Sequence, residues 1–163
     1  MCKSFTLIEL IIYVALTVII LNVGIYFTWQ VIESKMKINA YQEVGRNVNF
    51  VLEKISFEGK RAKSLIVPNF LGEETNELLL MMPDGQKIKI YLLDNRIVLD
   101  NDGQINFLTS NKVEIDRMIF KNVSSSFPGS FQIILKINYK NSEGRGEREA
   151  MVELQKTINL RDN

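Results

Sequence analysis

The N-terminal part of the chain is dominated by an uninterrupted run of apolar residues. The twenty residues from 10 to 29 carry no formal charge. A helix rises about 1.5 Å per residue, so this run reaches about 30 Å, the thickness of the hydrocarbon core of a bilayer. The pattern predicts a membrane-spanning helix over residues 5–29. One carboxylate, that of Glu9, lies where this helix begins.

Beyond the apolar run, the hydrophobic pattern changes to one that is typical of an amphipathic helix. Apolar residues recur at helical spacing on a single stripe, and charged residues occupy most other positions. The stripe is formed by Val44, Val48, Val51, Leu52 and Ile55. We predict that the helix continues over residues 30–63 and stops before Pro68. Gly45 and Gly59 weaken the pattern, and two helices with a hinge near residues 30–40 are the alternative.

The rest of the chain, residues 64–163, consists of short apolar runs separated by turn residues. Several of these runs alternate between apolar and polar positions, as half-buried strands do. Strands are expected at residues 78–82, 87–93, 96–99, 104–108, 113–120, 131–139 and 148–160, with turns at residues 94–95 and 100–103. A helix followed by six or seven strands predicts an α+β fold, in which the amphipathic part of the helix covers one face of an antiparallel sheet head.

Composition narrows the chemistry that this chain can perform. It has 163 residues, 46% of them hydrophobic and 24% charged, and a net charge of +1. It contains no histidine, and its only cysteine is Cys2. An internal disulfide, a Cys/His zinc site and catalysis by histidine are therefore excluded. We find no catalytic constellation, and we predict that the protein is not an enzyme and uses no metal or cofactor.

Two ordinary interpretations of the N-terminus fit poorly. A secretory signal peptide has a shorter apolar core followed by a small-residue cleavage site, and residues 25–30 contain none. A plain membrane anchor explains the apolar run but has no use for Glu9. A carboxylate in hydrocarbon costs up to about 2.5–3.5 kcal/mol, so such residues usually have a partner. Glu9 reaching headgroup water without a partner remains the simpler alternative.

Residues 4–10, Ser-Phe-Thr-Leu-Ile-Glu-Leu, resemble the N-terminal motif of the type IV pilin and pseudopilin family. In that family a prepilin peptidase cuts before the phenylalanine and then methylates its new amine. The resemblance implies cleavage between Ser4 and Phe5, loss of residues 1–4 as a leader, and N-methylation of Phe5. Ser4 stands where the family normally has glycine.

The resemblance also implies a role for Glu9 in filament assembly. A neighbouring subunit's Phe5 amine would neutralise the Glu9 carboxylate inside the apolar helix bundle, and a subunit in the wrong register would leave both charges unpaired. The implied partners are other pilins, the prepilin peptidase, the membrane platform protein of the assembly machine and, before assembly, lipid. The implied location is the cytoplasmic membrane in a single pass, with the head outside, and then the filament.

Two further stretches are similar to minor pilins and pseudopilins, although more loosely. Residues 108–120 match a Thr/Ser turn that leads into a strand ending in phenylalanine, and residues 154–163 match the tail of J-type and competence pseudopilins. These matches favour a minor component over a major shaft pilin, whether of a type IV pilus-like filament or of a type II secretion or competence pseudopilus, and they do not distinguish these machines. The alternative is a single-pass protein whose β-rich head binds a ligand and never polymerises.

Other candidate sites have simpler explanations. Residues 100–103, Asp-Asn-Asp-Gly, could hold calcium, but the pattern is more typical of a tight turn. Residues 144–148 form a basic segment that could contact DNA, although a solvated hairpin tip is the better explanation. Lys54, Lys60, Arg61 and Lys63 could also contact DNA or a protein partner. The last three complement the negative C-terminal end of the helix.

Overall fold

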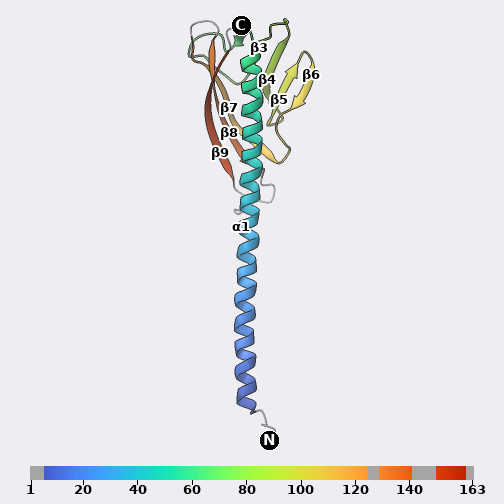
Figure 1. Cartoon of the computed structure of the whole chain (residues 1–163), viewed down its shortest axis with the longest axis vertical. Helices are drawn as coiled ribbons and strands as arrows, with labels where there is room; N and C mark the ends of the chain where they lie inside the picture. The colour runs from blue at the N-terminus through green and yellow to red at the C-terminus, as the bar shows by residue number, and fades with distance from the viewer. Residues whose placement is uncertain (1–5, 125–128, 141–149, 161–163) are drawn as a thin grey trace.

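The computed structural model describes residues 6–124, 129–140 and 150–160. Over these residues the chain forms one long helix, α1 (Leu7–Arg61, 55 residues), and nine strands. The strands gather into a head at the C-terminal end of α1, and the N-terminal part of the helix extends far beyond it (Figure 1). The α+β fold class, with a long N-terminal helix packed on antiparallel sheets, is confirmed.

Helix α1 is continuous, so the alternative of two helices with a hinge near residues 30–40 is wrong. The chain has no proline before Pro68, and an isolated glycine lowers helix stability by only about 1 kcal/mol. The helix ends close to the predicted residue 63, where Ala62 leaves the helical conformation and donates its N–H to the Glu58 carbonyl at 2.9 Å.

The first sheet has five antiparallel strands in the order β1-β3-β4-β5-β6. They are β1 (Ser64–Val67), β3 (Leu78–Met81), β4 (Lys87–Leu93), β5 (Arg96–Asn101) and β6 (Gln104–Phe107). The predicted turns are present. Asp94 and Asn95 join β4 to β5 with φ of 50° and 56°, and Asp102 and Gly103 join β5 to β6 with φ of 52° and 93°. Asp, Asn and Gly tolerate these left-handed conformations, which tight hairpins require.

The second sheet has four antiparallel strands in the order β2-β7-β8-β9. They are β2 (Glu74–Thr75), β7 (Val113–Asn122), β8 (Ser130–Tyr139) and β9 (Met151–Asn159). The predicted last hairpin is confirmed for the described residues, since β8 pairs with β9 from Ser130–Asn159 to Asn138–Met151. The sequence did not predict β1 and β2. Both are short, and neither shows a clear alternating pattern.

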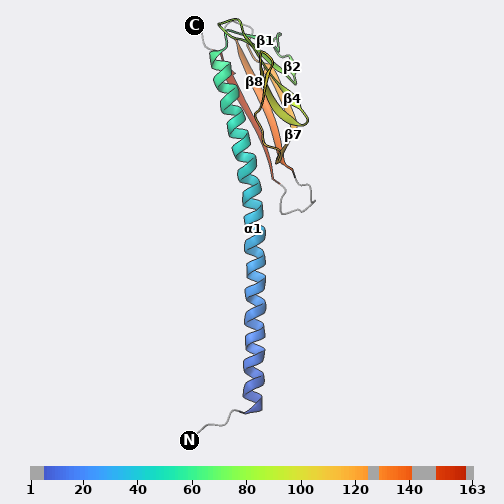
Figure 2. The same ribbon diagram turned by 90° about the vertical axis from the view of Figure 1, so that its right-hand side faces the viewer.

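The core lies between one face of α1 and the inner faces of both sheets. Every residue of the predicted apolar stripe on α1 is buried, from Val44 to Ile55. The helix lies along β8 and β9 (Figure 2). Gly59 allows this close approach, because a Cβ at that position would lie 2.9 Å from the Ile158 side chain and 3.2 Å from the ring of Phe131. That ring packs edge-on against Phe120 with centroids 6.3 Å apart.

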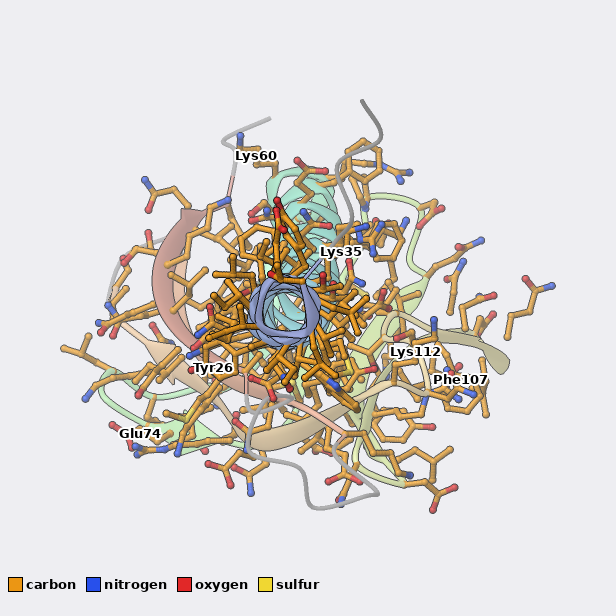
Figure 3. All side chains as sticks on the ribbon, turned by 90° about the horizontal axis from the view of Figure 1, so that it is seen from below. Tyr26, Lys35, Lys60, Glu74, Phe107 and Lys112 are labelled. Atoms are coloured by element: carbon orange, nitrogen blue, oxygen red, sulfur yellow. The ribbon has the colours of Figure 1, made fainter. Side chains whose placement is uncertain are left out.

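The two halves of α1 have different surroundings. In the head-bound half, residues 40–61, one face is buried against the sheets. In the free half, residues 7–39, no residue is buried, and every residue except Met36 is exposed. Seen from the N-terminal end, carbon-rich side chains such as that of Tyr26 surround the free half on all sides (Figure 3). This half contains a segment long and apolar enough to cross a membrane.

Candidate assembly site

Residues 7–29 of the free half have an almost wholly apolar surface, because their threonine and asparagine side chains bond to the helix itself. The side chains of Thr17, Asn22 and Thr28 donate to the carbonyl oxygens four residues earlier, at 2.8, 2.8 and 2.9 Å. These bonds satisfy polar groups that would otherwise be costly in hydrocarbon. Between residues 7 and 32, Glu9 is therefore the one formal charge on a surface suited to lipid or to other helices.

Glu9 lies in the first turn of α1. Its backbone N–H bonds to the carbonyl of Thr6 at 3.1 Å, and Thr6 has the extended conformation of a helix N-cap. A carboxylate in this position is favourably oriented toward the positive end of the helix dipole. Its neighbours Leu7, Ile8 and Leu10 are all more than half exposed. No side chain of the described residues forms a hydrogen bond or ion pair with the Glu9 carboxylate.

The other two residues predicted for this site, Ser4 and Phe5, lie outside the described residues. The structure therefore places Glu9 alone, at the open end of an exposed apolar helix. A partner for its charge has to come from the segment before Thr6 or from another molecule.

Gly24 lies in the middle of the free half and leaves room for a second helix. A Cβ at this position would meet no atom within 4 Å, so the backbone is open on that side. Small residues at such positions let membrane helices approach closely. The helix continues through Gly24 without a break, so the glycine does not interrupt it.

A second polar site joins the helix to the head, and the sequence did not predict it. The Ser110 hydroxyl donates to Glu43 Oε1 at 2.9 Å, and the Ser110 N–H donates to Asn47 Oδ1 at 2.8 Å. Asn47 also donates to the Glu43 carbonyl at 2.8 Å. The hydrogen bond from Ser110, more than any other interaction, lowers the pKa of the Glu43 carboxyl below its usual value. We call these three residues the helix clamp.

The turn that carries Ser110 is itself fixed to the first sheet. The hydroxyl of Thr109, which is buried, accepts a hydrogen bond from the backbone N–H of Ile97 at 3.1 Å, and its carbonyl accepts one from the Arg96 guanidinium at 2.7 Å. Arg96 also stacks over the ring of Phe107 at 4.0 Å. The Thr-Ser pair noted in the sequence is thus a structural joint between the helix and the first sheet.

The remaining sequence candidates have structural roles or lie outside the described residues. The Asp100 carboxylate accepts a hydrogen bond from the Gly103 N–H at 2.8 Å, as the tight-turn interpretation requires. Lys54 and Arg61 pair with the buried Glu58, whereas Lys60 points away from the sheets (Figure 3). The basic segment 144–148 and the end of the tail, residues 161–163, are outside the described residues.

Across the three described ranges, no group of three histidine, cysteine, aspartate or glutamate residues could hold a metal ion. Comparison with family models, with curated proteins and with solved structures finds no match to this chain. The function must therefore be inferred from the residues of the chain and from their arrangement.

Proposed function

We propose that this protein is a minor pilin or pseudopilin, a structural subunit that polymerises through its N-terminal helix into a pilus-like filament of a pilus, type II secretion or competence machine. In this proposal a prepilin peptidase removes residues 1–4 by cutting between Ser4 and Phe5, and the new Phe5 amine is methylated. The protein is not an enzyme in this role, and its function is to assemble with other pilins.

The observation that carries the proposal is the free half of α1. Thirty-three residues, 7–39, extend from the head without burying a single side chain, and between residues 7 and 32 Glu9 carries the one formal charge. Large exposed apolar surfaces normally mark contacts with lipid or protein. Lipid alone would explain the apolar residues. It would not explain a carboxylate at the open end of the helix that has no partner among the described residues.

Pairing between subunits would give Glu9 a role. In a bundle of such helices, the Phe5 amine of one subunit lies close to the Glu9 carboxylate of the next, and the two charges neutralise each other away from water. A buried charge without a partner costs several kcal/mol, so the pairing would fix how far each helix is inserted into the bundle. Gly24 would then lie at a close contact between neighbouring helices.

The proposal assigns partners and a location. Before assembly, the free half spans the cytoplasmic membrane once and contacts lipid, with the head outside. The prepilin peptidase and the membrane platform protein of the assembly machine act on this form, and other pilins bind it through their N-terminal helices. Binding of nucleic acid to the head is not part of the proposal.

The processing step is tested by the N-terminal residue of the protein purified from its native membrane. Intact mass and peptide sequencing should give a chain that begins with a methylated Phe5. An intact Met1, in cells that process their other prepilins, would indicate a single-pass anchor with a β-rich head that does not polymerise. A chain that begins beyond Trp29 would indicate an ordinary signal peptide.

The assembly step is tested by Glu9→Gln, with Glu33→Gln as the matched control farther along the same free half. Glu9→Gln should reduce the protein in sheared filaments by at least about tenfold, since a partner charge left without its carboxylate costs more than about 1.4 kcal/mol. Glu33→Gln should leave the filament fraction unchanged, and both variants should reach the membrane normally. Equal filament fractions for the two variants would contradict the pairing.

A further inference from the structure

Each sheet of the head ends in a strand whose outer edge pairs with no other described strand. The first sheet ends in β6 and the second in β9, and the two strands lie on opposite sides of α1 (Figure 1). Proteins commonly protect an open edge with charges, proline or a bulge. None of these occurs in β6, whose four residues, Gln-Ile-Asn-Phe, are all described and pair with β5 without a register shift. Its Ile105 and Phe107 side chains are 52% and 46% exposed.

The hydrogen bonds of β6 show which of its backbone groups point to the open edge. The Leu108 N–H donates to the Ile97 carbonyl at 2.8 Å. Because bonding alternates along an antiparallel strand, the even-numbered residues of β6 bond to β5. The backbone N–H and C=O groups of Ile105 and Phe107 therefore point away from the sheet.

The same reasoning applies to β9. The Tyr139 N–H donates to the Ala150 carbonyl at 2.8 Å, and the pairing of β8 with β9 continues from there without a register shift. The even-numbered residues of β9 therefore bond to β8. The backbone groups of odd-numbered residues, among them Glu153 and Gln155, point to the open edge.

The two edge strands run in opposite directions along α1. Strand β9 begins beside Tyr41 and ends at Gly59, which its Ile158 side chain contacts, so β9 runs away from the free half. Strand β6 runs toward the free half, because the chain that follows it reaches Ser110, which bonds to Glu43. When two copies point in the same direction, β6 of one is therefore antiparallel to β9 of the other.

The side chains beside the two edges favour one register. Ile105, Phe107, Glu153 and Gln155 are all on the outer faces of their sheets, because the even-numbered residues of both strands face α1. The Arg96 guanidinium stacks over the Phe107 ring at 4.0 Å. With Glu153 opposite Phe107, an exposed carboxylate comes next to this cation, and opposite charges across strands are stabilising. Ile105 is then opposite Gln155.

We propose that the β6 edge of one copy pairs with the β9 edge of a second copy. Ile105 and Phe107 exchange four backbone hydrogen bonds with Gln155 and Glu153, and the first sheet of one head continues into the second sheet of the next. The contact uses two different edges, so each copy keeps one of each kind available, and the contact repeats along a filament. The inference rests on the proposed function, because the shared membrane or helix bundle holds the copies in one direction.

The test is a disulfide between two full-length chains that each carry a single cysteine. Cys2→Ser removes the native cysteine from both chains. One chain then carries Ile105→Cys and the other Gln155→Cys, and both are expressed together in the native host and oxidised in membranes and in sheared filaments. Directly opposite residues have Cα atoms about 5.5 Å apart, within the range that a disulfide spans. Together the two chains should give at least about tenfold more disulfide dimer than either chain expressed alone, because like edges do not meet in copies that point the same way.

A control pair checks the register. Ile105→Cys is combined with Asn159→Cys, which lies on the same edge of β9 but about 13 Å farther along the strand. This pair should give no more dimer than the single chains.

Two proline variants, placed in the Gln155→Cys chain, check that the backbone makes the contact. Glu153→Pro removes an N–H that points to the open edge, which the fold of one chain tolerates, and should lower the disulfide yield about fivefold. Thr157→Pro makes the same change on the same edge, beyond the segment that β6 covers, and should leave the yield unchanged. Both variants should keep the melting temperature of the parent head within a few degrees.

Three results would overturn the edge pairing. The first is a yield for Ile105→Cys with Gln155→Cys no higher than for either chain alone. The second is an equal yield with Asn159→Cys, and the third is an equal yield with Glu153→Pro and Thr157→Pro. A protein present in filaments without the disulfide would refute the pairing and leave the proposed function standing. A disulfide in membranes of cells whose filaments lack the protein would support the pairing and refute the proposed function.

Discussion

The two halves of helix α1 have the same backbone and opposite surroundings. The head-bound half buries one face, with Val44, Val51 and Ile55 at 0% exposure. The free half buries nothing, although it is the more apolar of the two, and side chains such as Ile20 remain 70% exposed. The head-bound half is apolar on one stripe and buries that stripe against its own head. Residues 10–29 of the free half are apolar all round and need an environment that the monomer does not provide.

The difference shows which half determines which property. The stability of the head should depend on residues 40–61 and be nearly independent of residues 7–39, because stability follows from buried contacts. Membrane insertion and assembly should depend on residues 7–39. Substitutions at matched positions in the two halves separate these properties, and we order them from the largest expected effect on the head to the smallest.

The largest effect is expected from placing a carboxylate on the buried face. Val48 is 1% exposed, and Val48→Asp would put an unpaired charge among the side chains of the sheets. We expect a loss of about 3–5 kcal/mol in the free energy of unfolding, enough to unfold most of the head at 37 °C. Thermal unfolding followed by circular dichroism in detergent, together with limited proteolysis, measures this loss.

The control for Val48→Asp is Val18→Asp in the free half, where Val18 is 51% exposed. We expect its head to unfold at the parent temperature, since the substitution touches no residue of the head. Membrane insertion should weaken, because an aspartate in the middle of a span costs about 2.5–3.5 kcal/mol. A head that is destabilised equally by both variants would show that the two halves are not independent.

An intermediate effect is expected at Gly59, where α1 touches β8 and β9. Gly59→Ala places a methyl group 2.9 Å from the Ile158 side chain and 3.2 Å from the Phe131 ring, so the helix or the sheet has to shift. We expect a net loss of about 1–2 kcal/mol, in spite of the better helix propensity of alanine. The matched variant Gly45→Ala meets no atom within 4 Å and should gain about 0.5–1 kcal/mol. Chemical denaturation of the two variants measures both changes, and a gain in both would contradict the close approach at Gly59.

Much of this fold could be predicted from the sequence, because hydrophobic periodicity reports directly on burial. The stripe from Val44 to Ile55 predicted the buried face of α1, and the Asp-Asn and Asp-Gly pairs predicted two hairpin turns. Gly59 was misjudged. A glycine within a helix looks like a weakness when only the helix is considered. A glycine is needed here because the ring of Phe131 lies against the helix backbone. Phe131 is distant in sequence and becomes a neighbour of Gly59 only in the folded chain.

The helix clamp could not be predicted for a related reason. Glu43 and Ser110 are 67 residues apart, and each is unremarkable alone, since Glu on a helix and Ser in a turn are both common on protein surfaces. The N-terminal motif has the opposite property. Its residues are consecutive, so the sequence alone reveals it. The structure of a single chain does not show which group pairs with the Glu9 carboxylate.

The last and most specific effect, no larger than that of Gly59→Ala, is expected at the helix clamp and depends on pH. The two carboxylates of the comparison are Glu43, which the head hydrogen-bonds, and Glu9, which no described side chain contacts. Because the pKa of the Glu43 carboxyl is lowered on folding, chiefly by the hydrogen bond from Ser110, its ionised form stabilises the head. This contribution is present above the ordinary value of 4.5 and is lost as the pH falls through the lower value of the folded protein.

Ser110→Ala removes that hydrogen bond and should cost about 1–2 kcal/mol near neutral pH. The difference in unfolding free energy between the parent and Ser110→Ala should stay constant from pH 7 to about pH 5 and shrink below pH 4.5, because protonation of Glu43 weakens the bond in the parent. Ser34→Ala, an exposed serine of the free half, should follow the parent's pH profile. Denaturant titrations at a series of pH values measure all three proteins. The difference in unfolding free energy between the parent and Ser110→Ala could instead be the same at pH 3 and pH 7. The Ser110 hydroxyl would then stabilise the head through Asn47 or the turn, and the Glu43 charge would have no part in holding the helix to the head.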